Sequence, residues 1–358
     1  MTGRQRLHET LGFGSPDRVP YWEVIGHWAE AVERWQEEGL PADVHLRQYF
    51  NLDRYELAPI HIGLMPAFKA EILEQDETTE VYRDEFGILY RRVRKGRTIP
   101  QYIRFPLATR DDWNDFKRRL NPDSPARYPL YWEDYKRCVA GRDYPLGVHG
   151  GSIFGWLRNW MGLQGISLAL YDDPAWVQEM MDHLAEYMMR LVSRAVEEIG
   201  DIDYCIMWED MCYRSGSLIS PGHFKRMMVP CYRRITGYLR SHGVKHIMVD
   251  CDGNHDELIP LWLEGGVNGV YPLEVAAGED PVALRKKYGR DLLLCGGIDK
   301  RVLARDKKAI EQEVRSKAPW LIEQGGWIPS IDHAVPPDVP FENYCYYWEL
   351  LREIAERG

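Results

Sequence analysis

From residue 144 onward, short apolar runs alternate with longer segments in which apolar residues recur every three or four positions. The short runs predict β-strands, and the longer segments predict amphipathic helices. The predicted strands cover residues 144–150, 203–208, 245–249, 267–273, 291–294 and 327–331. The helices that follow them are predicted to about 198 and over 221–241, 254–264, 280–288, 306–323 and 341–356. Strands that alternate with helices in this way pair in parallel, with the helices as crossover connections.

Two earlier segments extend this series. Residues 21–25 and 55–62 each have the composition of a strand. They bring the number of strands to about eight, the number that closes a TIM barrel. We therefore predict a single α/β domain over residues 1–358, a (β/α)8 TIM barrel. A doubly wound open sheet is the alternative, but no Gly-x-Gly-x-x-Gly segment opens a helix after the first strand.

Residues 56–105, approximately, depart from the barrel pattern. Apolar and polar residues alternate from 80 to 93, which predicts an antiparallel hairpin that turns at 84–87. Residues 98–105 are predicted to add another strand. We interpret this region as an N-terminal β-hairpin insertion that forms a small subsheet beside the barrel.

Composition narrows the set of functions. The formal net charge is -10 at pH 7, and an acidic chain repels phosphate backbones, so nucleic acid is not expected as a partner. No apolar window is long enough to predict a membrane span, and residues 1–8 are polar and basic, unlike a signal peptide. The 7 cysteines are scattered and form no Cys-x-x-Cys pair, which favours a reducing, cytoplasmic compartment.

Titratable residues gather where the predicted strands end. In a barrel these ends converge on one mouth, where catalytic residues lie. The apolar strand 327–331, for example, ends abruptly at Asp332 and His333. The structural alternative for this pair is a helix N-cap at Asp332 and a loop histidine at His333. The full set of strand-end residues is Glu23, His27, His149, Trp208, Glu209, Asp210, Asp250, Asp252, Glu274, Asp299, Asp332 and His333.

Many carboxylates in one mouth raise one another's pKa unless a cation offsets their charge. The pattern therefore predicts a metal ion, carboxyl groups held as acids, or basic groups on the substrate. Asp250 and Asp252 alternate along an extended chain, so both side chains point to the same side. With a distant histidine and a glutamate, they suit a hard or borderline cation. The structural alternative is that Asp250 caps a turn, Asp252-Gly253 forms it, and Glu209 pairs with an arginine such as Arg214.

Several short segments, spread over nearly the whole chain, carry a family resemblance. The most specific is Pro336-Pro337-Asp338-Val339-Pro340-Phe341-Glu342-Asn343. The others are Pro16–Pro20, Tyr82–Gly87, Leu218–Pro221 with the later Pro230, Tyr288-Gly289 and Gly296–Lys300. In these segments the chain resembles the uroporphyrinogen decarboxylase superfamily, which also contains corrinoid-dependent methyltransferases. The resemblance implies a (β/α)8 barrel, in agreement with the alternation of strands and helices.

Two positions bear on the branch of this superfamily. True uroporphyrinogen decarboxylases hold their substrate's carboxylates with an Arg-Gln-Ala-Gly-Arg type segment after the first strand, whereas residues 21–28 here contain Glu23 and no arginine. The methyltransferase branch binds zinc through a His-x-Cys-Gly-Asn segment and a later cysteine. Those places correspond to Asp250-Cys251-Asp252-Gly253-Asn254 and to His333, where the decarboxylases have a histidine. Harder ligands thus replace the thiolates.

The resemblance to the methyltransferase branch implies a metal-dependent enzyme that moves a methyl group between a small methylated compound and a corrinoid on a partner protein. A divalent metal, with zinc as the expected ion, would act as a Lewis acid. Its predicted ligands are Asp250, Asp252, His333, Glu209 and Glu274. The predicted catalytic residues, for proton transfer or positioning, are His333, Asp210 and His149. The residues predicted to bind substrate are Glu23, His27, Trp208, Asp299 and Asp332.

Two alternatives stand beside this hypothesis. A decarboxylase or related lyase would use His333 and a carboxyl group as an acid–base pair, without a metal. A non-enzymatic protein of the same fold would bind a corrinoid or a tetrapyrrole. Release of carbon dioxide, a metal requirement and spectral titration with a corrinoid distinguish these alternatives.

Overall fold

The centre of the protein is a curled sheet of seven parallel strands, seen in a computed structural model that describes residues 1–94 and 100–357. The strand order is β1-β6-β7-β10-β11-β12-β13. Each strand is a short apolar run, and the six strands predicted from residue 144 onward are confirmed in place. The bounds are β1 Glu56–Leu57, β6 Leu146–His149, β7 Tyr204–Trp208, β10 His246–Asp250, β11 Gly269–Tyr271, β12 Leu293–Cys295 and β13 Trp327–Ile328.

The prediction of a first strand at residues 21–25 is wrong. This segment is irregular, and a single parallel bridge joins its far end, at His27, to Val335, which follows β13. On its other side, the carbonyl of Tyr21 accepts a hydrogen bond from the N–H of Asp53, just before β1 (3.0 Å). The sheet therefore closes in a TIM-barrel-like manner through an irregular segment instead of an eighth strand.

Side-chain packing explains why no regular strand forms there. The ring of Trp22 turns into the barrel against Tyr55, with centroids 4.4 Å apart. The ring of Tyr21 packs outward on Trp348, with centroids 6.0 Å apart. Gly26 then adopts a φ of +85°, which ends the extended conformation. The rings of Trp22 and Tyr21 thus hold this segment in place, and its backbone makes few hydrogen bonds to the neighbouring strands.

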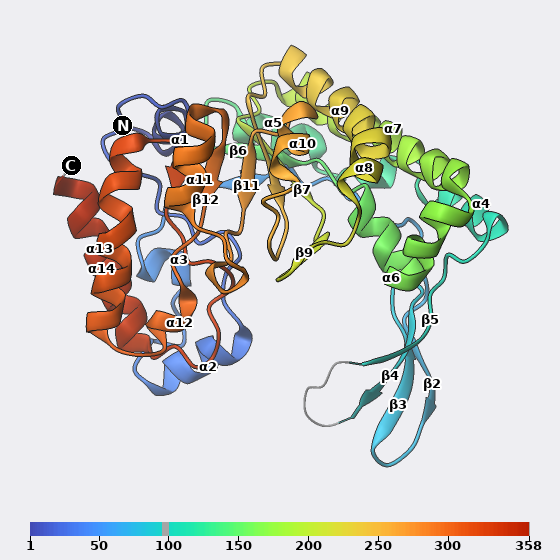
Figure 1. Ribbon diagram of the computed structural model, residues 1–358, viewed down its shortest axis with the longest axis horizontal. Coiled ribbons are helices and arrows are strands. Elements are labelled where there is room, and N and C mark those ends of the chain that lie inside the picture. The colour runs from blue at the N-terminus through green and yellow to red at the C-terminus, as the bar shows by residue number, and fades with distance from the viewer. Residues whose placement is uncertain (95–99, 358) are drawn as a thin grey trace.

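Helices cover the outside of the sheet on both sides (Figure 1). Their starts follow local capping rules, as at Ser220, whose side chain accepts from the N–H of His223. The longer helices are α6 Phe154–Asp172, α7 Pro174–Ile199, α9 Val229–Ser241, α11 Pro281–Tyr288, α13 Lys307–Gln324 and α14 Phe341–Arg357. None of the helices in the described ranges is long and apolar enough to cross a bilayer.

Shorter elements complete the chain. They connect the main helices and strands and carry the loops at the two ends of the barrel. Their bounds are α1 Gly3–Leu11, α2 Ala29–Glu37, α3 Leu46–Tyr49, α4 Arg110–Arg119, α5 Trp132–Val139, α8 Pro221–His223, β8 Cys212–Tyr213, β9 Gly216–Ser217, α10 Ile259–Glu264 and α12 Lys300–Leu303.

A four-stranded antiparallel sheet projects away from the body of the protein near α4 and α6 (Figure 1). Its strands, in order, are β2 Glu71–Gln75, β3 Thr79–Arg83, β4 Leu89–Val93 and β5 Gln101–Arg104. The prediction that this subsheet begins near residue 56 is wrong, because β1 pairs in parallel with β6 of the central sheet. Residues 98 and 99 of the strand predicted at 98–105 lie outside the described residues.

Helix α1 closes the N-terminal end of the barrel. Its residues Leu7 and Leu11 are buried in the apolar cluster inside the sheet, together with Met248 of β10 and Tyr271 of β11. The opposite end, where the strands finish, is therefore the open mouth, as in TIM barrels generally.

Candidate active site at the barrel mouth

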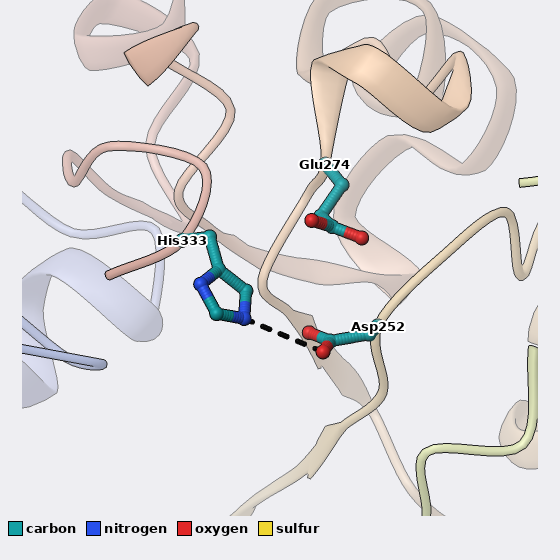
Figure 2. A group of neighbouring side chains, drawn as sticks. All are labelled: Asp252, Glu274 and His333. Carbon is teal, nitrogen blue, oxygen red and sulfur yellow. Dashed lines mark hydrogen bonds and ion pairs between the residues drawn. The ribbon is translucent and has the colours of Figure 1, made fainter. Parts of the chain in front are cut away.

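Side chains from three strand ends meet at the mouth of the barrel. Asp252 follows β10, Glu274 follows β11 and His333 follows β13. One donor atom from each lies within 4.8 Å of the others. The Nε2 atom of His333 is 3.3 Å from Oδ2 of Asp252, and the carboxylate of Glu274 faces the same space (Figure 2). This group, called the Asp252 cluster below, brings together three of the five predicted metal ligands.

A second acidic group shares Asp252. Carboxylate oxygens of Asp210, Asp250 and Asp252 also lie within 4.8 Å of one another. Burial raises the pKa of Asp250 to about 8, and the charges of Asp210 and Asp252 act in the same direction. Burial and the charge of Asp252 also raise the pKa of Asp210, although Arg158 lies 3.7 Å from its carboxylate and opposes this. Without a cation, Asp250 therefore holds a proton that a free carboxylate would lose at neutral pH.

The turn after Asp252 fixes the direction of its side chain. Gly253 has a φ of +84°, and a Cβ atom there would lie 2.8 Å from the backbone of Tyr213. Only glycine suits both conditions. The N–H of Gly253 donates to Oε2 of Glu274 (2.9 Å), which joins the loops after β10 and β11. Cys251 is buried at 1% exposure and is in neither acidic group, so it does not restore a thiolate ligand.

Two basic groups offset part of the negative charge of the Asp252 cluster. The hydrogen bond to Asp252 raises the pKa of His333, against the opposing effect of burial. The Nζ atom of Lys300 lies 3.4 Å from Oε1 of Glu274. A divalent cation bound by the carboxylates would therefore compete with the proton on His333 and with the ammonium group of Lys300.

The structure does not bring Glu209 together with the other predicted metal ligands. Glu209 is fully buried, and neither acidic group at the mouth includes it. Its carboxylate lies at the start of α6 and accepts hydrogen bonds from five donors. These are the hydroxyls of Ser152 and Tyr232 and the N–H groups of Ile153, Phe154 and Gly155. It stabilises the otherwise unpaired N–H groups at a helix N-terminus.

The carboxylates of Asp332 and Asp299, two residues predicted to bind substrate, are held by contacts within the protein. Asp332 is 0% exposed, and its two oxygens accept from the N–H groups of Lys300 (2.9 Å) and Val275 (3.0 Å). It thereby holds the two loops that carry Lys300 and Glu274. Asp299 is the N-cap of α12 and forms an ion pair with Arg301 (2.7 Å). Both carboxylates thus have partners within the protein, and substrate binding by Asp332 and Asp299 stays a prediction.

Glu23 and His27 face helix α14 instead of the mouth. Glu23 accepts hydrogen bonds from the hydroxyls of Tyr344 (2.9 Å) and Ser330 (3.1 Å). The hydroxyl of Tyr344 also lies 2.9 Å from Nε2 of His27. Substrate binding by Glu23 and His27 stays a prediction, and these contacts are with other side chains of the protein. Burial raises the pKa of Glu23 to about 8 and lowers that of His27 to about 4, so both are uncharged at neutral pH.

His149 and Trp208 remain at the mouth, beside the acidic groups. Nδ1 of His149 accepts from the N–H of Gly151 (2.9 Å), which leaves the ring proton on Nε2. Burial lowers the pKa of His149 to about 4, so its imidazole is neutral at pH 7. Trp208 pairs in register with Asp250, and the guanidinium of Arg158 lies 5.6 Å from its ring centroid.

Two basic residues of the site were missed from the sequence. Lys300 belongs to the segment Gly296–Lys300, which marks the family, and its position directly after a strand could have identified it. Arg158 lies within α6, far from any strand end. No pattern in the sequence places it beside Asp210.

Comparisons with known proteins agree with this fold. The uroporphyrinogen decarboxylase (URO-D) family model matches residues 85–354. A uroporphyrinogen decarboxylase from Thermus thermophilus is 26% identical over 216 residues, which are 58% of this chain and 55% of that protein, so the match spans about half the length of the curated relative. A methyltransferase from Methanosarcina mazei has a TM-score of 0.62 at 14% identity over 99% of both chains. At that identity the likeness shows the fold alone.

A curled parallel sheet, crossover helices and titratable residues at the strand ends define a TIM-barrel-like α/β protein with its site at the mouth. The family match identifies it further. The chain belongs to the uroporphyrinogen decarboxylase family, as the sequence segments indicated. The family model and the curated relative are both named for uroporphyrinogen decarboxylase, an enzyme.

Proposed function

We propose that this protein is a metal-dependent enzyme that moves a methyl group between a small methylated compound and a corrinoid on a partner protein. The observation that carries the proposal is the Asp252 cluster, in which Asp252, Glu274 and His333 offer donor atoms within 4.8 Å of one another at the barrel mouth. Family membership and a fold shared with a methyltransferase support it.

The residues present fit a divalent cation. Carboxylate oxygens and an imidazole nitrogen are suitable ligands for zinc and for harder divalent ions. No group among the described residues donates a hydrogen bond to the carboxylate of Asp250. Burial raises its pKa to about 8, so its ionised form would be stabilised by a nearby cation. Asp250, Asp252, Glu274 and His333 would hold the metal, which supplies Lewis-acid activation of the atom that carries the methyl group.

The other residues at the mouth have roles that do not depend on the metal's geometry. The Nε2–H of His149 is free to donate a hydrogen bond to a substrate oxygen, since Nδ1 already accepts from Gly151. Burial and the charge of Asp252 raise the pKa of Asp210, which favours it as the group that gives a proton to a leaving heteroatom. The ring of Trp208 forms a wall of the mouth next to Asp250.

Methyl transfer is tested directly with cob(I)alamin as the acceptor. Its nucleophilic cobalt takes the methyl group with its own electron pair, the bond from methyl to heteroatom breaks, and the heteroatom takes a proton. Loss of cob(I)alamin absorbance in the presence of a panel of methylated compounds, with the metal-loaded full-length protein, is the expected result. Activity that is unchanged by Asp252→Ala would contradict the proposal. Absorbance changes on corrinoid binding without any transfer would favour a binding protein.

A metal-free decarboxylase is the second candidate, and one observation favours it. In the absence of a cation, burial raises the pKa of Asp250 to about 8, so it could serve as an acid at neutral pH, and the pKa of Asp210 is raised in the same direction. A decarboxylase could use such an acid, with His333, to protonate the carbon that loses carbon dioxide. Carbon dioxide release from carboxylated test compounds that persists with a strong chelator, and that is lost in His333→Ala, would establish this function in place of methyl transfer.

A further inference from the structure

An apolar cavity of about 130 Å³ lies inside the barrel, directly below the acidic residues of the mouth. Met248, two residues before Asp250 on β10, lines it, as do Ile206 of β7 and Tyr271 of β11. Tyr271 is the register partner of Asp250. The cavity therefore lies among the same strands that carry the acidic groups at their ends.

The wall of the cavity presents carbon atoms. The hydroxyl of Tyr204 donates to the carbonyl of Glu56 (2.7 Å), and that of Tyr55 donates to the carbonyl of Glu23 (2.8 Å). Both tyrosines thus line the cavity with their rings. Leu57, on the edge strand β1 of the seven-stranded sheet, is 37% exposed and lines the cavity. A leucine inside a barrel is normally packed, so this exposure shows that it borders open space.

One polar group in the wall lacks a partner. The side chain of Tyr271 is only 4% exposed, yet its hydroxyl makes no hydrogen bond within the described part of the chain. Tyr271 and Asp250 are register partners on adjacent parallel strands, so their side chains point to the same side of the sheet. Tyr271 lines the cavity, so its hydroxyl is available to a ligand bound there.

We propose that this cavity binds the apolar body of the substrate, about the size of one ring, and that Tyr271 holds the substrate's oxygen or nitrogen atom beside Asp250. The size follows from volume, because an apolar protein cavity of about 150 Å³ binds benzene. A tetrapyrrole is several times larger than the cavity. The position of the reacting group beside the Asp252 cluster rests on the proposed function, whereas binding of the ring does not.

Benzyl alcohol, a neutral ring with one hydroxyl, is the probe for this proposal. Its affinity for the full-length protein is measured by isothermal titration calorimetry, with and without zinc. Leu57→Trp fills the cavity from a position that is already 37% exposed, so the fold is expected to tolerate it. We expect at least about a tenfold loss of affinity, the scale on which apolar pockets discriminate by size. The matched control Leu73→Trp, on β2 at 47% exposure, should bind the probe as the wild type does.

A second variant tests the hydroxyl. Tyr271→Phe should weaken binding of benzyl alcohol severalfold and leave binding of toluene unchanged, since only the alcohol has a group for Tyr271 to bind. No binding of either probe by the wild type, or equal binding by wild type and Leu57→Trp, overturns the inference whatever the metal content. If the wild type binds the probe, Leu57→Trp does not, and neither protein binds a metal, the cavity is supported as a binding site. That result would contradict the proposed metal-dependent function.

Discussion

Nε2 of His333 lies 3.3 Å from Oδ2 of Asp252, although 81 residues separate them in the chain. The contact exists because β10 and β13 both end at the barrel mouth. It joins a base with a raised pKa to an acid that belongs to both acidic groups. The pair is therefore the part of the site that both metal binding and proton transfer would use.

Replacement of Glu209 tests whether its carboxylate stabilises the fold or binds the metal. Glu209→Gln keeps the size of the side chain but replaces one acceptor oxygen with an NH2 group, which cannot accept from the N–H groups at the start of α6. We expect a loss of about 2 kcal/mol or more in the free energy of unfolding, with zinc affinity unchanged. Urea unfolding and calorimetry measure these two quantities. Glu186→Gln, at a residue whose side chain is 49% exposed, is the control and should change neither.

The buried carboxyl of Glu23 predicts a pH dependence of stability. Its pKa is raised from 4.5 to about 8 by burial, so the folded protein holds a proton that the unfolded chain releases. The stabilisation is complete below pH 4.5 and is lost as the pH rises through about 8. Between these values the free energy of unfolding should fall by about 1.4 kcal/mol per pH unit from this group. Glu23→Gln cannot ionise, so urea unfolding across this range should show a shallower slope; identical slopes would contradict the assignment.

Asp203 anchors the closed end of the barrel, away from the mouth. Burial alone would raise its pKa, but hydrogen bonds from His8, Arg4 and Arg142 lower it to about 2. Asp203→Asn leaves these basic groups without their carboxylate and should cost about 3–5 kcal/mol of stability. Asp201→Asn, at a side chain that is 80% exposed, should cost far less. Metal binding by both variants at low temperature should equal that of the wild type, because Asp203 lies at the opposite end of the sheet.

Much of the fold could be predicted from the sequence. Strands β6, β7 and β10 are short, mainly apolar runs, the pattern typical of a parallel strand that is buried on both faces. The site follows only in part. Asp250 and Asp252 are two residues apart on an extended chain, so their common direction is a property of the strand. Glu209 and Asp210 are adjacent and look equivalent, yet Asp210 has a φ of +42°, and the turn sends Glu209 to α6. No sequence pattern specifies that turn.

Lys300 should compete with a metal for Glu274. Its ammonium group lies 3.4 Å from Oε1 of Glu274, and both side chains are 20% exposed. Lys300→Met removes this positive charge and keeps the apolar stem, so zinc affinity should rise about severalfold, as expected for a partly screened ion pair. Lys287→Met, at an exposed pair with Asp256, is the control and should leave the affinity unchanged. A lower affinity in Lys300→Met would show that Lys300 supports the metal site instead of competing with it.

The binding of zinc to the chelator-treated full-length protein tests the central claim most directly. Isothermal titration calorimetry should show one ion bound per chain, with affinity reduced at least about tenfold in Asp252→Ala and in His333→Ala. Asp256→Ala, at a side chain that is 50% exposed, should bind as the wild type does. The affinity should also fall as the pH is lowered, because the proton on His333 competes with the metal. Absence of zinc binding by the wild type, or equal affinity in all three variants, would contradict a metal site at the Asp252 cluster.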